Sequence, residues 1–256
     1  MNRIWHLTNT TWFYLLGVLK HPKQIPFIAW QIFIKRVHLG ELLNLNRYKT
    51  WLRENDIKTV IDVGGHKGEF ASAIRAILPD AQIYSFEPLP ECYQKLSKRL
   101  MKYEKFKAYR VALGELRKEV TFWECAFTKS SSILSMTNLH KKTFPWTSNN
   151  TALTVQMEKL DDYIDRINLE KKIILKLDVQ GYQDKVLKGG KQILKKIDFV
   201  LVETSFKTLY EGEPTFDAIY KLLIEEGFKY AGNFDQMLSP LDQTIMQADA
   251  LFIRNS

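Results

Sequence analysis

Cysteine is scarce in this chain of 256 residues, which contains only two. Cys92 and Cys125 form no C-x-x-C pair and no spacing with histidine that a zinc site would use. Neither a disulfide framework nor a metal-stabilised scaffold is therefore predicted, and a reducing compartment fits this composition best.

Long apolar runs are also missing. The two apolar runs near the N-terminus, residues 12–19 and 25–34, fall short of the roughly 18 residues that a membrane-spanning helix needs. No small-residue cleavage site follows the first run, so no export signal is predicted. We expect a cytoplasmic protein whose residues 1–50 form a helical N-terminal extension.

A dense tract of lysine and arginine is a third absence. The formal net charge of +8 comes from basic residues that are spread along the chain. A nucleic-acid partner would favour a concentrated basic stretch. The sequence therefore predicts a mildly basic surface and no nucleic-acid partner.

Short strand-like runs alternate with helical stretches from residue 57 onward. This alternation predicts an α/β fold with a mostly parallel sheet covered by helices on both faces, in one domain over residues 51–256. We expect strands at residues 58–64, 82–88, 106–114, 120–125, 152–158 (an edge-like strand), 173–179, 198–204, 228–233 and 250–254, and helices at 68–78, 90–101, 182–196 and 215–227. Residues 128–151 show too little periodicity for an element and read as a long lid or substrate-binding loop.

The glycine-rich stretch VIDVGGHKGEF, residues 60–70, joins the first strand to the first helix. Such a turn lets the backbone approach a polar ligand. Its glycines do not fit the dinucleotide pattern G-x-G-x-x-G, because His66 stands two positions after Gly64. Asp62, Gly64 and Gly68 instead match the acidic-x-Gly-x-Gly-x-Gly turn of methyltransferases, with His66 in place of the middle glycine.

Glu87 ends the second strand, 25 positions after Asp62. An acceptor for ribose hydroxyls belongs at this place in nucleotide-binding α/β sheets. A tight βα turn and a surface Glu87 would be the non-functional explanation of the same residues. The ligand we favour is S-adenosylmethionine, and the expected binding residues are Asp62, Gly64, Gly65, Gly68, Glu87, Pro88 and Ala112.

A family resemblance covers residues 57–254. The blocks VIDVGGHKGEFA, IYSFEPLPECYQKL, VALGE, LDDYI, ILKLDVQGYQDKVLKGG, LVETSFKTLYEGEPTFDAIYKLLIEEGF and QADALFIR resemble, in this order, those of FkbM-type methyltransferases. The resemblance implies a class I, S-adenosylmethionine-dependent fold with a seven-stranded Rossmann-like sheet, and O-methylation of hydroxyls on sugars, glycans or natural products. His66 stands where the family usually has Asn, and Gln183 where related sequences usually have Glu.

Methylation of a hydroxyl requires an aligned acceptor oxygen and removal of its proton. Asp178 and Glu203 end two buried strands, so both should face the cleft at the carboxyl ends of the sheet. We expect them to be the catalytic residues, either as bases or as ligands of a divalent cation, Mg²⁺ or Mn²⁺. Helix capping by Asp178 and an ion pair of Glu203 are the structural alternatives. For His140 and Ser130 to Ser132 in the long loop, and for Tyr182, surface or turn roles are favoured.

Two other functions stay open at this point. One is a nucleotide-dependent oxidoreductase on a similar sheet, and the other is a non-catalytic binding module that retains the fold. The aromatic and basic residues of the N-terminal extension suit either peripheral contact with the inner face of a membrane or packing on the domain. Packing is favoured.

Overall fold

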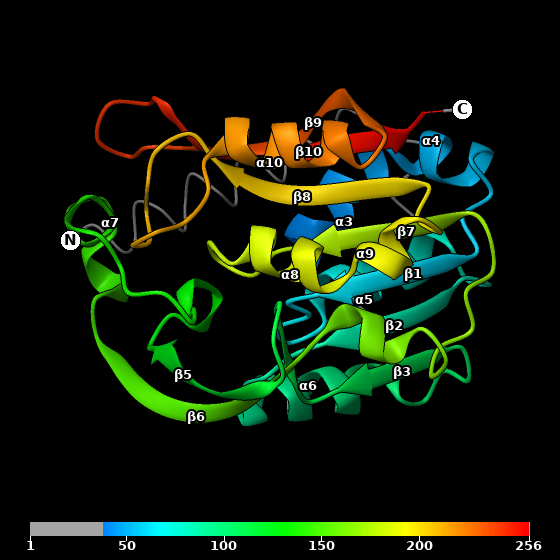
Figure 1. Cartoon of the computed structure of the whole chain (residues 1–256), viewed down its shortest axis with the longest axis horizontal. Coiled ribbons are helices and arrows are strands. Elements are labelled where there is room, and N and C mark those ends of the chain that lie inside the picture. Colours follow the sequence, from blue (N-terminus) through cyan, green and yellow to red (C-terminus); the bar gives the residue numbers. More distant parts are fainter. Residues whose placement is uncertain (1–37, 256) are drawn as a thin grey trace.

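A seven-stranded sheet forms the centre of the computed structural model, which describes residues 38–255 (Figure 1). Its strand order is β3-β2-β1-β7-β8-β10-β9. All neighbours are parallel except β10, which runs antiparallel to β8 and β9. The α/β class and the mostly parallel sheet are as predicted. The strands are β1 (Thr59–Val63), β2 (Gln82–Phe86), β3 (Phe106–Tyr109), β7 (Ile173–Leu177), β8 (Phe199–Ser205), β9 (Phe228–Leu238) and β10 (Ile245–Arg254).

Every residue of the central strands β1 and β7 is buried. Their sequences, TVIDV and IILKL, are the near-continuous apolar runs expected of a parallel sheet covered on both faces. Each run contains a single charged residue, and the register pairs these two, Asp62 and Lys176, across the strands. The middle of the sheet therefore contains a buried acid beside a buried base.

Helices cover both faces of the sheet (Figure 1). One apolar core joins the sheet to α3, α4, α5 and α6, and a second core joins the opposite face to α8, α9 and α10. Leu96 of α6 and Leu223 of α10 are fully buried examples from the two cores. The helices are α5 (Glu69–Ile77), α6 (Pro90–Leu100), α8 (Gln183–Gly189), α9 (Lys191–Leu194) and α10 (Phe216–Glu225). No helix among residues 38–255 is long and apolar enough to cross a membrane.

The described part of the N-terminal extension packs on the domain. Helices α3 (Leu39–Arg47) and α4 (Lys49–Glu54) bury Leu42 and Leu52 completely in the first core. The ring of Tyr48, between the two helices, stacks on Phe234 of β9 with ring centroids 3.7 Å apart. The expected boundary between residues 50 and 51 thus falls inside a helix pair that belongs to this core. The aromatic residues before position 38 lie outside the described residues.

A second sheet corrects two strand predictions. Residues 106–114 form two strands, β3 and β4 (Ala112–Leu113), and β4 belongs to a three-stranded sheet of order β4-β6-β5. Strand β6 (Asn150–Glu158) pairs antiparallel with β5 (Lys118–Cys125) over eight residues. Because β4 occupies its other side, β6 is the central strand of the small sheet, not an edge strand.

Two further boundaries differ from prediction. The predicted loop over residues 128–151 contains the 3-10 turns η2 (Thr128–Ser130) and η3 (Pro145–Thr147) and the helix α7 (Asn138–Thr143). Six residues are too few for a detectable period, and α7 begins because the Thr137 hydroxyl accepts a hydrogen bond from the His140 amide at 3.2 Å. The predicted helix at 182–196 is two helices that meet at Gly190.

Candidate functional site

A cavity of about 570 Å³ lies at the carboxyl ends of the central strands. Its walls include the turn after β1, the end of β2, the residues after β7, and side chains of β8 and β10. The small sheet and the segment that contains η2, α7 and η3 provide the other side. We call residues 127–147 the lid segment. The cavity lies where ligands bind in open α/β sheets.

Gly64 makes a turn that no other residue fits. Its φ is +83°, and a Cβ added to it would lie 1.8 Å from the main-chain oxygen of Asp178. The amides of Gly64 and Gly65 both donate to the carbonyl of Phe86 at 3.0 Å. These two N–H groups therefore hold the turn against β2 and are not free for a ligand.

Replacing Gly64 with alanine should destabilise the fold by about 4 kcal/mol or more, since the left-handed backbone costs about 1–2 kcal/mol and the clash separates the ends of β1 and β7. Gly212 is the matched control, because its φ is +76° and a Cβ there meets nothing within 4 Å. Gly212→Ala should therefore lower the free energy of unfolding only by the cost of the left-handed backbone, about 1–2 kcal/mol. Urea unfolding of both variants measures the difference, and equal losses would show that the contact with Asp178 is unimportant.

The two other predicted glycines differ in position. Gly65 lines the cavity. Gly68 precedes α5 with a φ of +81°, and a Cβ there would lie 2.9 Å from the side chain of Leu96. Gly68 thus faces α6, where its role is to let the two helices approach each other.

Asp62 lies beneath the glycine turn and is completely buried. The Ser85 hydroxyl donates to its Oδ2 at 2.9 Å, and the Lys176 ammonium lies 3.8 Å from its Oδ1. Burial raises the pKa of Asp62, and the nearby charge of Lys176 opposes this shift. Asp62 is absent from the cavity wall, so its contacts support the turn from below.

Glu87 lies in the cavity wall together with Pro88 and Ala112, as expected. Its two carboxylate oxygens accept hydrogen bonds from the amides of His66 and Leu89, both at 2.8 Å. Burial raises the pKa of Glu87 to about 7. The carboxylate therefore holds both the β1 turn and the β2 turn while it faces the cavity.

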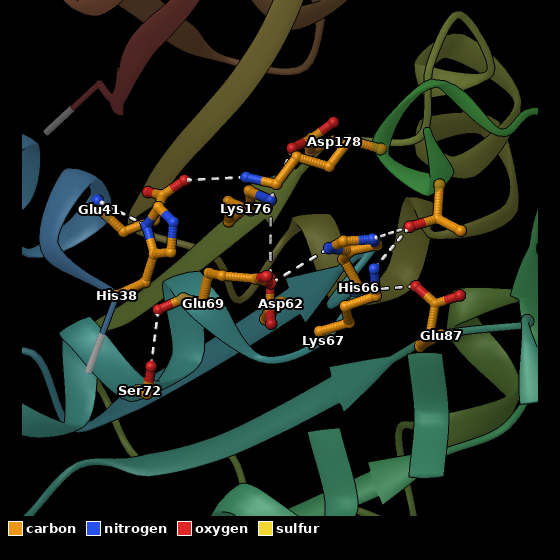
Figure 2. A network of polar contacts seen from close by, with 12 residues as sticks. His38, Glu41, Asp62, His66, Lys67, Glu69, Ser72, Glu87, Lys176 and Asp178 are labelled. Atoms are coloured by element: carbon orange, nitrogen blue, oxygen red, sulfur yellow. Dashed lines mark hydrogen bonds and ion pairs between the residues drawn. The ribbon is translucent and has the colours of Figure 1, made fainter. Parts of the chain in front are cut away.

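His66 connects the glycine turn to the lid segment (Figure 2). Its φ is +46°, a conformation in which histidine is among the better tolerated residues. Its ring nitrogens lie 3.1 Å from Glu69 Oε2 and 2.7 Å from the Thr128 hydroxyl. Burial alone would raise the pKa of Glu69, but the His66 contact outweighs it and lowers this pKa to about 2. The Lys67 ammonium also donates to Thr128, at 2.9 Å.

The two predicted catalytic carboxylates are brought together. Gln180 Nε2 donates to Asp178 Oδ1 and to Glu203 Oε2, each at 2.8 Å. The Lys176 ammonium donates to the other oxygen of Asp178 at 3.1 Å (Figure 2). All three partners line the cavity with Gln180.

These carboxylates differ in charge because their surroundings differ. Burial alone would raise the pKa of Asp178, but Lys176 and the hydrogen bond from Gln180 outweigh it and lower this pKa. Burial, together with the charges of Asp178 and Asp249, raises the pKa of Glu203 well above its usual value. Asp178 is thus the stronger acid of the pair, and Glu203 is the stronger base.

Three cavity residues were missed by sequence reasoning. Lys176 is signalled by a lone charge inside an apolar strand, and Asp249 by an acid in QADALFIR. The register places Asp249 directly opposite Glu203, and burial with the charge of Asp178 raises the pKa of Asp249 to about 7. Gln180 had no such signal, because its importance comes from contacts with residues far along the chain.

The loop histidine, expected at the surface, is buried. His140 is 3% exposed, its Nε2 lies 3.1 Å from the Thr147 hydroxyl, and its ring meets that of Tyr210 edge-on. Burial lowers the pKa of His140 to about 4. Tyr182, Ser130 and Ser131 also line the cavity, whereas Ser132 donates to the carbonyl of Gln180.

A metal centre is not evident in the part of the chain that is described. Among residues 38–255, no group of three or more His, Cys, Asp or Glu side chains is arranged to hold a metal ion. Two of the acids in this region are instead paired with the ammonium of Lys176, which lies 3.8 Å from Asp62 and 3.1 Å from Asp178.

The chain is similar in sequence to known methyltransferases. The model of the methyltransferase FkbM domain matches residues 62–230, more than half of the chain. The 2-O-methyltransferase NoeI of Sinorhizobium fredii (strain NBRC 101917 / NGR234) is 27% identical over 192 residues, which are 71% of this chain and 77% of that protein. Methyltransferase sdnD of Sordaria araneosa is 24% identical over 204 residues, 66% of this chain and 73% of that protein.

Among solved structures, the magnesium protoporphyrin IX methyltransferase of Synechocystis PCC 6803 is similar with a TM-score of 0.46 and 11% identity, over 85% of this chain and 81% of that one. The family match covers the glycine turn, Glu87, Asp178 and Glu203. The class I sheet predicted from the resemblance is present in full. The chain therefore belongs to the FkbM methyltransferase family and is an S-adenosylmethionine-dependent methyltransferase.

Proposed function

We propose that the protein transfers the methyl group of S-adenosylmethionine to a hydroxyl of a sugar, glycan or natural-product acceptor. The observation that carries this proposal is the pair Asp178 and Glu203, which meet at one amide nitrogen in the cavity wall. A hydroxyl must lose its proton when it is methylated, and paired carboxylates are suited to take it. The similarity to a 2-O-methyltransferase supports transfer to oxygen.

The residues around the glycine turn fit the methyl donor. S-adenosylmethionine supplies an electrophilic methyl group on a positively charged sulfur. Glu87 still has acceptor capacity on the cavity side for hydroxyl groups, and Leu89 and Val111 provide apolar wall for a base. We assign Gly65, Glu87, Pro88 and Ala112 to direct contact, and Asp62, Gly64 and Gly68 to support of the turn.

The lid segment and the small sheet are the proposed acceptor side. Phe122, Phe144, Trp146 and Tyr182 contribute aromatic surface to the cavity, and Ser130 contributes a polar group. Aromatic faces with a few polar groups suit an acceptor that has both apolar surface and hydroxyls.

Two measurements test the proposal. Calorimetry should detect binding of S-adenosylmethionine and of its demethylated product, and absence of both at millimolar concentration would rule out the donor site. A labelled-methyl transfer assay over lipid-linked glycans, nucleotide sugars and polyketides should find the acceptor. Running it with and without a chelator, followed by Mg²⁺ or Mn²⁺, tests the alternative of a metal-assisted reaction.

Glu87→Gln should weaken donor binding about tenfold and destabilise the fold by about 1–3 kcal/mol. An amide can accept at only one of the two backbone N–H groups that Glu87 now satisfies, so the other stays unpaired. Calorimetry gives the affinity and urea unfolding the stability. Glu91→Gln, on the exposed first turn of α6, is the control. Parental donor affinity in folded Glu87→Gln would remove Glu87 from the donor site.

We further propose a cytoplasmic enzyme that contacts a membrane surface. The mixture of aromatic and basic residues before position 38 supports this, and so do the exposed Leu139 and Trp146 beside Lys141 and Lys142 in the lid segment. A liposome flotation assay should compare the full chain with one that begins at His38 and so keeps α3 in the core. Equal flotation of both proteins, or none of either, contradicts a role for the N-terminal segment.

A further inference from the structure

Gln180 is held from both its backbone and its side chain. It follows β7 with a φ of +50°. Its carbonyl accepts a hydrogen bond from the Ser132 hydroxyl at 2.6 Å, and the Tyr210 hydroxyl lies 2.9 Å from its Oε1. A residue in this sparsely populated conformation persists when its surroundings determine it, as they do here from the lid segment and from the loop after β8.

The side-chain amide of Gln180 has one nitrogen with two hydrogens, and both are used. One is donated to Asp178 Oδ1 and the other to Glu203 Oε2, each at 2.8 Å. A flipped amide would place its oxygen against two carboxylate oxygens. The chemistry of the three groups therefore fixes the orientation of the amide.

The contacts leave the two carboxylates unequal. Each oxygen of Asp178 already accepts a hydrogen bond, one from Gln180 and one from Lys176. Glu203 accepts only at Oε2, and within residues 38–255 its Oε1 has no hydrogen-bond partner. Glu203 also lines the cavity, so Oε1 is the carboxylate oxygen of the pair that is available to an acceptor.

The surroundings of Glu203 are mostly acidic. Its cross-strand neighbour is Asp249, and Glu213 lies in the loop after β8. These charges and burial disfavour the ionised form of Glu203, whereas the amide of Gln180 favours it. The titratable and charged groups whose charge acts on Glu203 are Asp178 and Lys176 of the β7 segment, Asp249 of β10, and Glu213.

We propose that Gln180 is a positioning residue that gives the two carboxylates different roles. Asp178 is held as a fixed negative charge, and Glu203 Oε1 takes the acceptor proton. The inference rests on the proposed O-methyltransferase function. In the step, the acceptor oxygen forms its bond to the methyl carbon as the carbon–sulfur bond breaks, and the electron pair of that bond stays on sulfur. The hydroxyl proton moves to Glu203 Oε1, so the products are the methyl ether and the neutral thioether.

Gln180→Met tests this inference because it keeps the side-chain length and removes both donated hydrogen bonds. We expect kcat to fall by about 10²-fold, with the KM for the donor within about threefold of the parent. The acid limb of the kcat profile should move to higher pH, because the ionised form of Glu203 has lost a hydrogen bond that favours it. Gln180→Glu, which adds a like charge, should move the limb further in the same direction.

Gln192→Glu is the control for Gln180→Glu, because it makes the same substitution at an exposed position of α9. It should leave kcat and its pH profile unchanged. The melting temperature of each variant identifies loss of fold. A folded Gln180→Met with the parental acid limb overturns the inference, even if its turnover is reduced, because a purely structural glutamine would produce that result. If the parent protein neither binds the donor nor transfers methyl groups, the proposed function fails instead.

Discussion

Asp178→Asn is expected to lower turnover by on the order of 10² or more while donor affinity changes by less than about threefold. Asp178 is the carboxylate that Lys176 keeps ionised, and its charge stabilises the positive charge that the acceptor oxygen develops as it receives the methyl group. Asparagine keeps the volume and can still accept from Gln180 or Lys176, but it supplies no charge. Single-turnover transfer with a labelled donor measures the rate, and calorimetry measures the affinity.

Asp165→Asn is the matched control, because Asp165 is exposed and lies outside the cavity wall. It should behave as the parent protein in both measurements. An Asp178→Asn variant with parental turnover on the true acceptor would remove Asp178 from the mechanism. A loss of donor affinity that equals the loss of rate would instead place Asp178 in donor binding.

The site elements that sequence reasoning predicted are those specified by local pattern. The turn at Gly64, Glu87 at the end of β2, and Asp178 and Glu203 at the ends of two buried strands all follow from an apolar run and the residue that ends it. The parallel arrangement of those strands then brings the four positions to one edge of the sheet. For this reason the cavity could be located without knowing any contact.

The parts that sequence reasoning missed depend on contacts between distant segments. Strand β4 has only two residues, and it is a strand because its backbone pairs with β6. A surface position was predicted for His140, but the helix α7 places its ring against that of Tyr210. The role proposed for Gln180 depends on its contacts with Glu203 and with Ser132 of the lid segment. None of these relations leaves a periodic or compositional signal in the chain.

Lys176→Met should destabilise the fold by about 3–5 kcal/mol at neutral pH, because it leaves the buried Asp62 and the partly exposed Asp178 without their counter-charge. Lys176 is 9% exposed, and its ammonium lies 3.1 Å from Asp178 Oδ2 and 3.8 Å from Asp62 Oδ1. Burial alone would lower the pKa of Lys176, but the charges of Asp178 and Asp62 outweigh it and raise this pKa. Methionine fills a similar volume, so packing changes little and the electrostatic loss dominates.

The loss should depend on pH in a defined direction. In the parent, the pKa of Asp178 is lowered, so its stabilising contribution is present above the unfolded-state pKa and is lost as the pH falls through the folded-state pKa. Without Lys176, burial raises the pKa of Asp178 above its unfolded value, and the cost of ionising it grows as the pH rises. The difference in unfolding free energy between parent and variant should therefore be larger at pH 8 than at pH 5.

Two further variants test whether the loss of stability comes from the buried charge of Lys176. Lys172→Met removes a lysine just before β7 whose side chain is 55% exposed and lies 3.4 Å from Asp198, and such an exposed pair should contribute at most about 1 kcal/mol. The double variant Lys176→Met with Asp178→Asn removes one uncompensated acid, so it should recover part of the stability and flatten the pH dependence. Urea unfolding at pH 5 and pH 8 measures all four proteins. A Lys176→Met variant whose loss is the same at both pH values, or no larger than that of Lys172→Met, would show that Lys176 does not neutralise the acids beneath the glycine turn.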